Sequence, residues 1–175
     1  RLKLNQTSIA DGYSSITILF ADNVGFTPLS EKMRPAELVS FLNEIFSEFD
    51  LLVTKYKLEK IKTIGDAYMV AGGLPLVSND HAKRIANFAL EMIEVIKKFN
   101  SASSHKLDLR IGIHSGPAIA GVIGLKKFSY DVWGNAVNIA SRMESHGLPG
   151  KIQVSSETYE FLRNKSKQLI FSTTD

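Results

Sequence analysis

Asp22 and Asp66 are the residues whose type and position most directly suggest chemistry in this chain. Each follows a short run with β-branched residues: ITILFA at positions 16–21 precedes Asp22, and KIKTIG at positions 60–65 precedes Asp66. A carboxylate at the end of a buried strand is costly to desolvate, and a divalent cation is its usual partner. Two such aspartates on neighbouring strands predict a pair of metal ions that assists an oxygen nucleophile in phosphoryl chemistry. The alternative is that each aspartate caps the turn or helix that follows it.

The segments around these aspartates predict the elements that position them. Residues 16–21 form a nearly continuous apolar run, which is typical of a central strand covered on both faces. Apolar residues then recur every three or four positions over residues 38–56, after Pro35, which predicts a long helix. Residues 60–64 and 67–71 predict a hairpin with a Gly-Asp turn.

The rest of the chain predicts further helices and strands. A second helix covers residues 82–96, and His81 at its start is interpreted as a surface or capping residue, because no second histidine or carboxylate stands at ligand spacing from it. The other expected elements are strands at 107–114 and 117–123 joined by Ser115 and Gly116, a helix at 133–146, a strand at 152–154, a helix at 158–162 and a closing strand at 169–171.

The resulting order, β-α-β-β-α-β with additions, predicts an α+β fold. It is that of a ferredoxin-like split βαβ, with helices packed on one face of a mostly antiparallel sheet. RNA-binding modules, acylphosphatases and nucleotide cyclases share this fold, so the fold alone does not select a function.

Composition excludes several classes of protein. The chain of 175 residues can form one domain with a sizeable core, and its net charge is +3. It has no cysteine, which excludes disulfides and thiolate metal sites. Its basic residues are scattered and do not alternate with aromatic residues, so we expect no nucleic acid partner. No apolar run reaches the length of about 20 residues that a membrane span needs, and we expect a cytoplasmic location, although the parent protein could be membrane-anchored.

Four ordered motifs resemble the catalytic domain of class III adenylyl and guanylyl cyclases. They are FADNVGFT at 20–27, KIKTIGDAYM at 60–69, GIHSGP at 112–117 and YDVWGNAVNIASRM at 130–143. The resemblance runs from about residue 10 to about residue 162. One such motif alone would be weak, but four in order are specific.

The resemblance implies two divalent cations, Mg²⁺ or Mn²⁺, held by Asp22 and Asp66. In this family the main-chain carbonyl of the residue after the first aspartate also contacts a metal. That residue is usually Ile in the family and is Asn23 here. We expect this change to loosen or rewet the metal loop slightly without abolishing metal binding.

The segment after Asn23 is expected to bind phosphate. Main-chain N–H groups of Val24, Gly25, Phe26 and Thr27 lead into a helix and would cradle the β- and γ-phosphates of the substrate. Gly25 also reads as the residue that supplies a tight turn, and the two interpretations are compatible.

Lys62 and Asp131 indicate the base. Adenylyl cyclases of this family carry a Lys and an Asp or Thr at these places, whereas guanylyl cyclases carry a Glu and usually a Cys. Adenine offers N1 as an acceptor and its 6-amino group as a donor, which match a Lys donor and an Asp acceptor, whereas guanine presents the reverse pattern. The alternatives are an exposed strand lysine and a turn aspartate.

Asn138 and Arg142 lie four residues apart, so one face of a helix presents both. The resemblance implies that Asn138 orients the ribose and that Arg142 meets the charge that builds on the α-phosphate. Without the surrounding motif, the same pair would read as a solvated helix face.

These residues together imply an adenylyl cyclase that converts ATP to 3′,5′-cyclic AMP and pyrophosphate. In the family, Asp22 and Asp66 of one chain would face Lys62, Asp131, Asn138 and Arg142 of another. We therefore expect a homodimer with two shared sites. The alternatives are a guanylyl cyclase, a non-catalytic nucleotide-binding or dimerisation module, and an RNA-binding module.

We expect the chain to be a piece of a longer protein. Residues 1–14 are polar, contain an Asp11–Gly12 turn signal and read as a linker from an upstream sensor or coupling element, and residues 15–175 read as the catalytic domain. The family has a further phosphate-contacting lysine after the strand that here contains Phe171. Since the chain ends at Asp175, before that segment, the domain is expected to be truncated at its C-terminal end.

Overall fold

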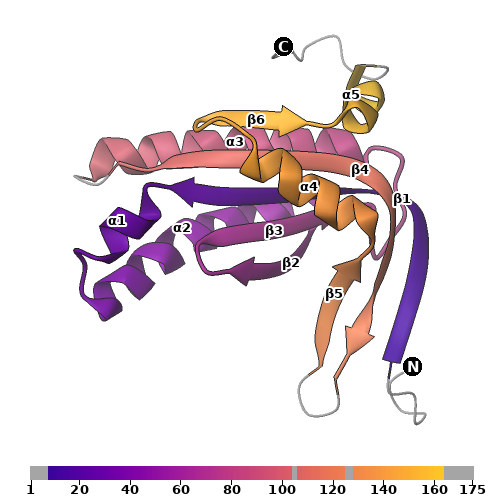
Figure 1. Cartoon of the computed structure of the whole chain (residues 1–175), viewed down its shortest axis with the longest axis horizontal. Coiled ribbons are helices and arrows are strands. Elements are labelled where there is room, and N and C mark those ends of the chain that lie inside the picture. Colours follow the sequence, from indigo (N-terminus) through magenta and orange to yellow (C-terminus); the bar gives the residue numbers. More distant parts are fainter. Residues whose placement is uncertain (1–7, 104–105, 125–127, 164–175) are drawn as a thin grey trace.

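The computed structural model describes residues 8–103, 106–124 and 128–163, and it places helices on a single twisted sheet (Figure 1). The strand order in this described part is β2-β3-β1-β4-β5, and β6 pairs with residues 110–113 of β4 outside this order. The elements in chain order are β1 (Ser8–Val24), α1 (Phe26–Ser30), α2 (Pro35–Tyr56), β2 (Glu59–Ile64), β3 (Ala67–Gly72), α3 (His81–Ala102), β4 (Asp108–Ile123), β5 (Ser129–Trp133), α4 (Asn135–Ser145), β6 (Lys151–Val154) and α5 (Ser156–Arg163).

The expected α+β fold with a mostly antiparallel sheet is confirmed. Among the described strands, β4 and β6 pair in parallel and the other pairings are antiparallel. The expectation that the helices lie on one face of the sheet is wrong in part, because α2 and α3 cover one face and α4 crosses the other (Figure 1).

The two faces of β1 explain this arrangement. Successive side chains of a strand point to opposite faces. Leu19 and Ala21 pack with α2 and α3, whereas Ile18 and Phe20 pack with the small residues of α4. A strand that is buried on both faces reads as one apolar run, which is the pattern seen before Asp22.

The ends of β1 and β4 form an arm that projects from the rest of the sheet (Figure 1). Ser8 to Tyr13 pair with residues 118–123 of β4, and residues 119–123 also pair with β5. A register shift in β1 separates this arm from the segment that starts at Ile16. The expectation of a linker over residues 1–14 is therefore wrong from Ser8 onward. Asp11 and Gly12 lie within the strand instead of a turn, because their main chain pairs with β4.

Three other expectations on elements need correction. Ser115 and Gly116 do not separate two strands, because β4 runs through them without a break. The helix expected at 133–146 starts at Asn135, and the strand β5 before it was not predicted. His81 is neither a surface residue nor a cap: it is 3% exposed, and its Nδ1 lies 2.6 Å from the hydroxyl oxygen of Thr17.

The closing strand expected at 169–171 lies outside the described residues. Within the described ranges, none of the helices combines the length and the apolar character needed to cross a membrane.

Candidate active site

Asp22 and Asp66 lie beside each other at one end of the sheet. Asp22 is inside β1, opposite Arg110 of β4, and Asp66 is in the turn between β2 and β3. Since Ala21 of β1 pairs with Tyr68 of β3, the two aspartates come from neighbouring strands. Burial, followed by the charge of Asp22, raises the pKa of Asp66. Asp22 is not a helix cap, because the residue that precedes α1 is Gly25.

Arg110 and Glu144 complete this cluster, and neither was predicted from the sequence. The Arg110 Nε donates to Glu144 Oε1 at 2.6 Å, and its Nη2 lies 3.3 Å from Asp22 Oδ2. Burial raises the pKa of Glu144; Arg110 opposes this shift, whereas the charges of Asp22 and Asp66 add to it. The signal that could have found Arg110 is its place in the strand that leads into GIHSGP, two residues before Gly112.

Asn23 links the two aspartate-bearing segments. Its side chain is buried, and its Nδ2 donates to the main-chain carbonyl of Asp66 at 2.7 Å. Its Oδ1 is buried without a hydrogen-bond partner among the described residues. The polar side chain therefore connects β1 to the turn of Asp66, a role that the sequence did not suggest.

The segment after Asn23 turns sharply into a short helix. Gly25 has φ 88°, a conformation that favours glycine, and α1 begins at Phe26. Gly25 and Thr27 are exposed, whereas Val24 and Phe26 are partly buried. The structure thus bears out the turn, and the phosphate contacts expected of Val24, Gly25, Phe26 and Thr27 stay a prediction.

The chemistry of these groups fits a divalent cation. The cluster holds three carboxylates (Asp22, Asp66 and Glu144) and one guanidinium, Arg110, which contacts Asp22 and Glu144, so it carries excess negative charge when all are ionised. Carboxylate and main-chain carbonyl oxygens are the ligands that Mg²⁺ and Mn²⁺ prefer. In the part of the chain that the structure describes, no three His, Cys, Asp or Glu side chains are placed to hold one ion. Asp22 and Asp66 would therefore need other oxygens as well.

Lys62 and Asp131 form an ion pair although they come from β2 and β5, the two ends of the strand order. Lys62 Nζ lies 2.6 Å from Asp131 Oδ2. Asp131 Oδ1 accepts a hydrogen bond from the main chain of Val132 at 2.8 Å, which fixes the carboxylate. The Lys62 side chain is 42% exposed and that of Asp131 18% exposed. The pair is thus held in place and still accessible. Lys62 is an exposed strand lysine, as the alternative interpretation expected, and it is paired with Asp131.

Asn138 and Arg142 lie on the exposed side of α4. The opposite side of this helix carries Ala136 and Ala140, which pack on the sheet. Glycine at position 112 permits this packing, because an added Cβ there would lie 1.9 Å from the main-chain nitrogen of Glu144. Asn138 and Arg142 thus share a face, as expected, and point to solvent.

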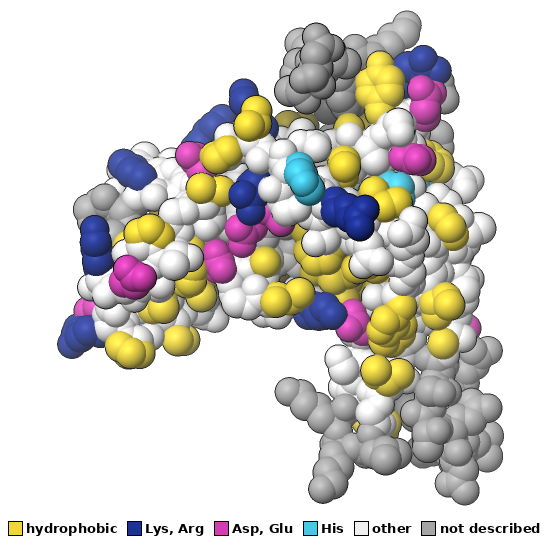
Figure 2. Space-filling view, viewed as in Figure 1, with side chains coloured by type: hydrophobic (Ala, Val, Ile, Leu, Met, Phe, Trp, Pro, Cys, Tyr) yellow, Lys and Arg dark blue, Asp and Glu magenta, His cyan; other side chains and the backbone are white. Residues whose placement is uncertain are grey.

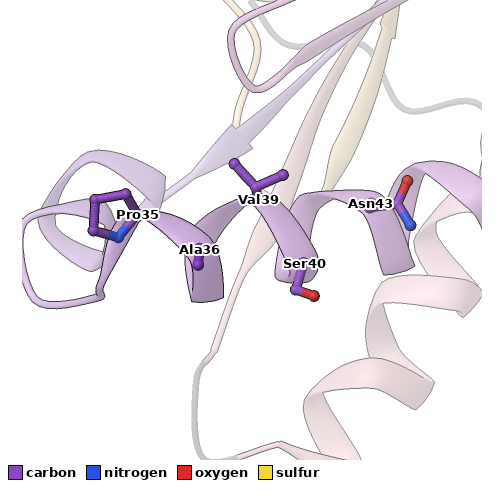
Figure 3. Close-up of a pocket in the computed structure, with 5 residues that line it drawn as sticks. All are labelled: Pro35, Ala36, Val39, Ser40 and Asn43. Carbon is purple, nitrogen blue, oxygen red and sulfur yellow. The ribbon is translucent and has the colours of Figure 1, made fainter.

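Figure 2 shows the main body at an angle to the arm, with charged side chains of both signs on the inner side of the corner. By contrast, a pocket of about 520 Å³ lies on the outer side of α2 and is lined by five uncharged residues (Figure 3). They are Pro35, Ala36, Val39, Ser40 and Asn43. None of them could provide the charge that the chemistry above needs.

The comparisons with known proteins agree on one family. The model of the adenylate and guanylate cyclase catalytic domain matches residues 9–174. An adenylate cyclase of Mycobacterium tuberculosis is 48% identical over 156 residues, which cover 89% of this chain and 35% of that protein. Human guanylate cyclase soluble subunit beta-2 is 43% identical over 171 residues, covering 97% and 28%. The chain thus spans about a third or less of these relatives.

A solved structure gives the same answer at the level of the fold. The catalytic core of a rhodopsin-guanylyl cyclase with converted specificity, in complex with ATPαS, superimposes with a TM-score of 0.85 at 41% identity. The superposition covers 89% of this chain and 85% of that one. With the motif match and the two curated relatives, this places the chain in a family: it belongs to the adenylate and guanylate cyclase catalytic domains.

Proposed function

We propose that this domain is an adenylyl cyclase that converts ATP to 3′,5′-cyclic AMP and pyrophosphate. The observation that carries the choice of ATP is the ion pair between Lys62 and Asp131. A Lys donor and an Asp acceptor match adenine N1 and the 6-amino group, and guanine would leave both groups mismatched. A site built from such polar pairs discriminates strongly, because each mismatch leaves a desolvated group unsatisfied.

Asp22 and Asp66 would hold two divalent cations together with the main-chain carbonyl of Asn23. When bound, these ions lower the pKa of the ribose 3′-hydroxyl and neutralise charge on the triphosphate. The chain's own contribution is to hold the two carboxylates side by side, through the pairing of β1 with β3 and the Asn23 hydrogen bond. Main-chain N–H groups from Val24 to Thr27 would contact the β- and γ-phosphates.

The reaction is an in-line displacement at the α-phosphorus. The ribose 3′-oxygen forms the new bond to phosphorus, the bond to the pyrophosphate oxygen breaks, and the hydroxyl proton leaves to solvent. Asn138 would orient the ribose, and Arg142 would meet the charge that develops on the α-phosphate, since a guanidinium is always charged and matches phosphate oxygens.

Two copies of the chain would build each site. Asp22 and Asp66 of one copy would face Lys62, Asp131, Asn138 and Arg142 of the other. Both sets are present in one chain, so a symmetric dimer would contain two equal sites. The Asn138, Arg142 and Lys62 side chains are exposed on one copy, which supports their availability for contacts with substrate bound to a second copy. An upstream sensor or coupling element, joined to the N-terminal end of the arm, would then set the relative orientation of the two copies. We also propose that the domain is located in the cytoplasm.

The test is a product assay with ATP or GTP, each with Mg²⁺ or Mn²⁺, followed by chromatography. We expect cyclic AMP from ATP and little cyclic GMP from GTP. Lys62→Glu should lower cyclic AMP formation, whereas Lys60→Glu is the matched control, since Lys60 pairs with Asp50 away from Asp131. Cyclic GMP as the main product would keep the family and refute the assignment of the base. No product at high protein concentration would favour a non-catalytic module.

A further inference from the structure

Arg110 sits between two carboxylates that belong to different elements. Its Nε donates to Glu144 Oε1 of α4 at 2.6 Å, and its Nη2 is 3.3 Å from Asp22 Oδ2 of β1. The shorter contact is the one to Glu144, whose side chain is 13% exposed. Arg110 therefore contacts Asp22 with one nitrogen only, while Glu144 is its main partner.

The positions of Arg110 and Glu144 are fixed by the packing of α4 on β4. The main chain of α4 rests on Gly112, where an added Cβ would come within 1.9 Å of the Glu144 nitrogen. Gly112 follows Arg110 by two residues in β4, so both point to the face that α4 covers. At the other end of the same contact, an added Cβ at Gly147 would lie 3.2 Å from the Arg110 Cγ. This close packing holds the Glu144 carboxylate against Arg110.

Glu144 is not placed as a third metal ligand. No described trio of acidic or histidine side chains could hold one ion, although Asp22, Asp66 and Glu144 are near enough for their charges to influence one another. A buried carboxylate so close to two others needs a cation of its own, and Arg110 supplies it.

We propose that Arg110 is a built-in counter-cation for Asp22, and that Glu144 is the positioning residue that draws Arg110 away when a divalent ion binds Asp22. The proposal rests on the metal site of the proposed function. A guanidinium and a metal ion compete for the same carboxylate, so Arg110 on Asp22 weakens metal binding. Glu144 offers Arg110 a second partner, which keeps the competition weak and makes Asp22 available.

The experiment is a titration of the purified chain with Mn²⁺ alone, without nucleotide, in which free Mn²⁺ is measured by electron paramagnetic resonance. Arg110→Met should tighten Mn²⁺ binding by about fivefold, the ratio that the loss of a partly exposed ion pair supports. Glu144→Gln should weaken binding by about as much, because Arg110 then has Asp22 as its remaining partner. Arg84→Met, which removes the same charge from α3, where Arg84 pairs with Asp80 just before the helix, should change binding less than about twofold.

The double variant separates a positioning role from a simple charge effect. If Glu144 acts through Arg110, then Glu144→Gln has little effect on Mn²⁺ affinity once Arg110 is Met, and the two changes are not additive. If Glu144 only contributes negative charge, the two changes are additive. Additivity would refute the proposal, as would unchanged or weaker binding in Arg110→Met.

The titration also has a defined meaning if Mn²⁺ binding is too weak to detect. Absence of Mn²⁺ binding in both the wild-type chain and Arg110→Met would also overturn the proposal, whereas binding seen in the variant alone would support it. Thermal melts establish that each variant is folded, and Arg110→Gln carries the same expectation if Arg110→Met does not fold. The proposed function is judged separately, by cyclic AMP formation, so that failure of one is distinguishable from failure of the other.

Discussion

Among single residues, Asn23 links the strand of Asp22 to the turn of Asp66 through one hydrogen bond of 2.7 Å. Asn23→Ala removes this donor, leaves the Asp66 carbonyl without it and opens a small cavity. We expect the free energy of unfolding to fall by about 1–2 kcal/mol, the cost of a lost hydrogen bond in a mostly buried place. Urea unfolding at neutral pH measures this change.

Asn43→Ala is the matched control for this prediction. Asn43 is exposed on the outer side of α2, and we expect its replacement to change the free energy of unfolding by less than about 0.5 kcal/mol. Equal effects of the two substitutions would show that the buried hydrogen bond of Asn23 does not stabilise the fold.

His114 gives a prediction on pH. It is buried, its Nδ1 lies 2.8 Å from the Ser155 hydroxyl oxygen, and burial lowers its pKa while Glu157 acts in the opposite direction. The neutral ring is therefore favoured in the folded chain. Its contribution to stability is complete above the unfolded pKa of about 6.5 and is lost as pH falls through the lower folded value.

Replacement of His114 by Asn tests this contribution. The free energy of unfolding of wild type minus that of His114→Asn should be largest above pH 7 and should shrink as pH is lowered from 6.5 to 5. Since other groups also titrate, the difference between the two proteins is the quantity to follow. A difference that stays constant over this range would contradict a buried neutral His114.

Candidate residues marked by a local sequence pattern could be predicted, whereas those defined by contacts between distant positions could not. Asp22 and Asp66 stand out because each ends or follows a local apolar run, and the structure brings them together. Glu144 and Arg110 are 34 residues apart, and no local pattern marks them as partners. His81 was misjudged for the same reason, because its partner Thr17 lies 64 residues away and the burial of His81 is a tertiary effect.

At the level of elements, Gly112 determines how closely α4 approaches β4. Gly112→Ala would place a Cβ 1.9 Å from the Glu144 nitrogen, and main-chain atoms cannot avoid it by changing a rotamer. We expect a loss of at least about 3 kcal/mol in the free energy of unfolding, at or beyond the upper end of the usual cost of overpacking. Cyclase activity should fall as well, because α4 carries Asn138 and Arg142.

Gly12→Ala is the matched control for Gly112→Ala. It also lies in a strand of the sheet, yet an added Cβ at Gly12 meets nothing within 4 Å. Its effect on stability should stay within about 0.5 kcal/mol. If Gly112→Ala melts at the wild-type temperature and keeps activity, then α4 does not depend on this close contact.

The elements were predicted best where their pattern is long and regular. The helix that starts at Pro35 was placed correctly, and so was the hairpin around Asp66, whose turn residues are a strong signal. β4 was divided in two because Ser115, Gly116 and Pro117 look like a break, although the pairing with β1 carries the strand through them. β5 is only five residues long, and no strand was predicted there; of its residues, only Trp133 fell within the expected helix.

At the level of the whole molecule, the candidate residues divide into two sets with different surroundings on one copy of the chain. Asp22 and Asp66 lie with Arg110 at one end of the sheet, whereas Arg142 points to solvent from α4 and has no ion pair among the described residues. On the proposed function, the partner of the Arg142 guanidinium is a phosphate of the bound substrate. This division is what a site shared between two copies requires.

Mixing two inactive variants tests this division. On the proposed function, Asp66→Ala would remove a metal-binding carboxylate and Arg142→Ala would remove the α-phosphate contact, so each homodimer would contain two defective sites. In a mixed dimer, one site carries both substitutions and the other carries neither. At equal amounts and free exchange about half of the dimers are mixed and each has one intact site, so we expect about a quarter of wild-type cyclic AMP formation. Unmixed variants at the same total concentration are the control, and a mixture as inactive as they are would mean that each chain builds its site alone.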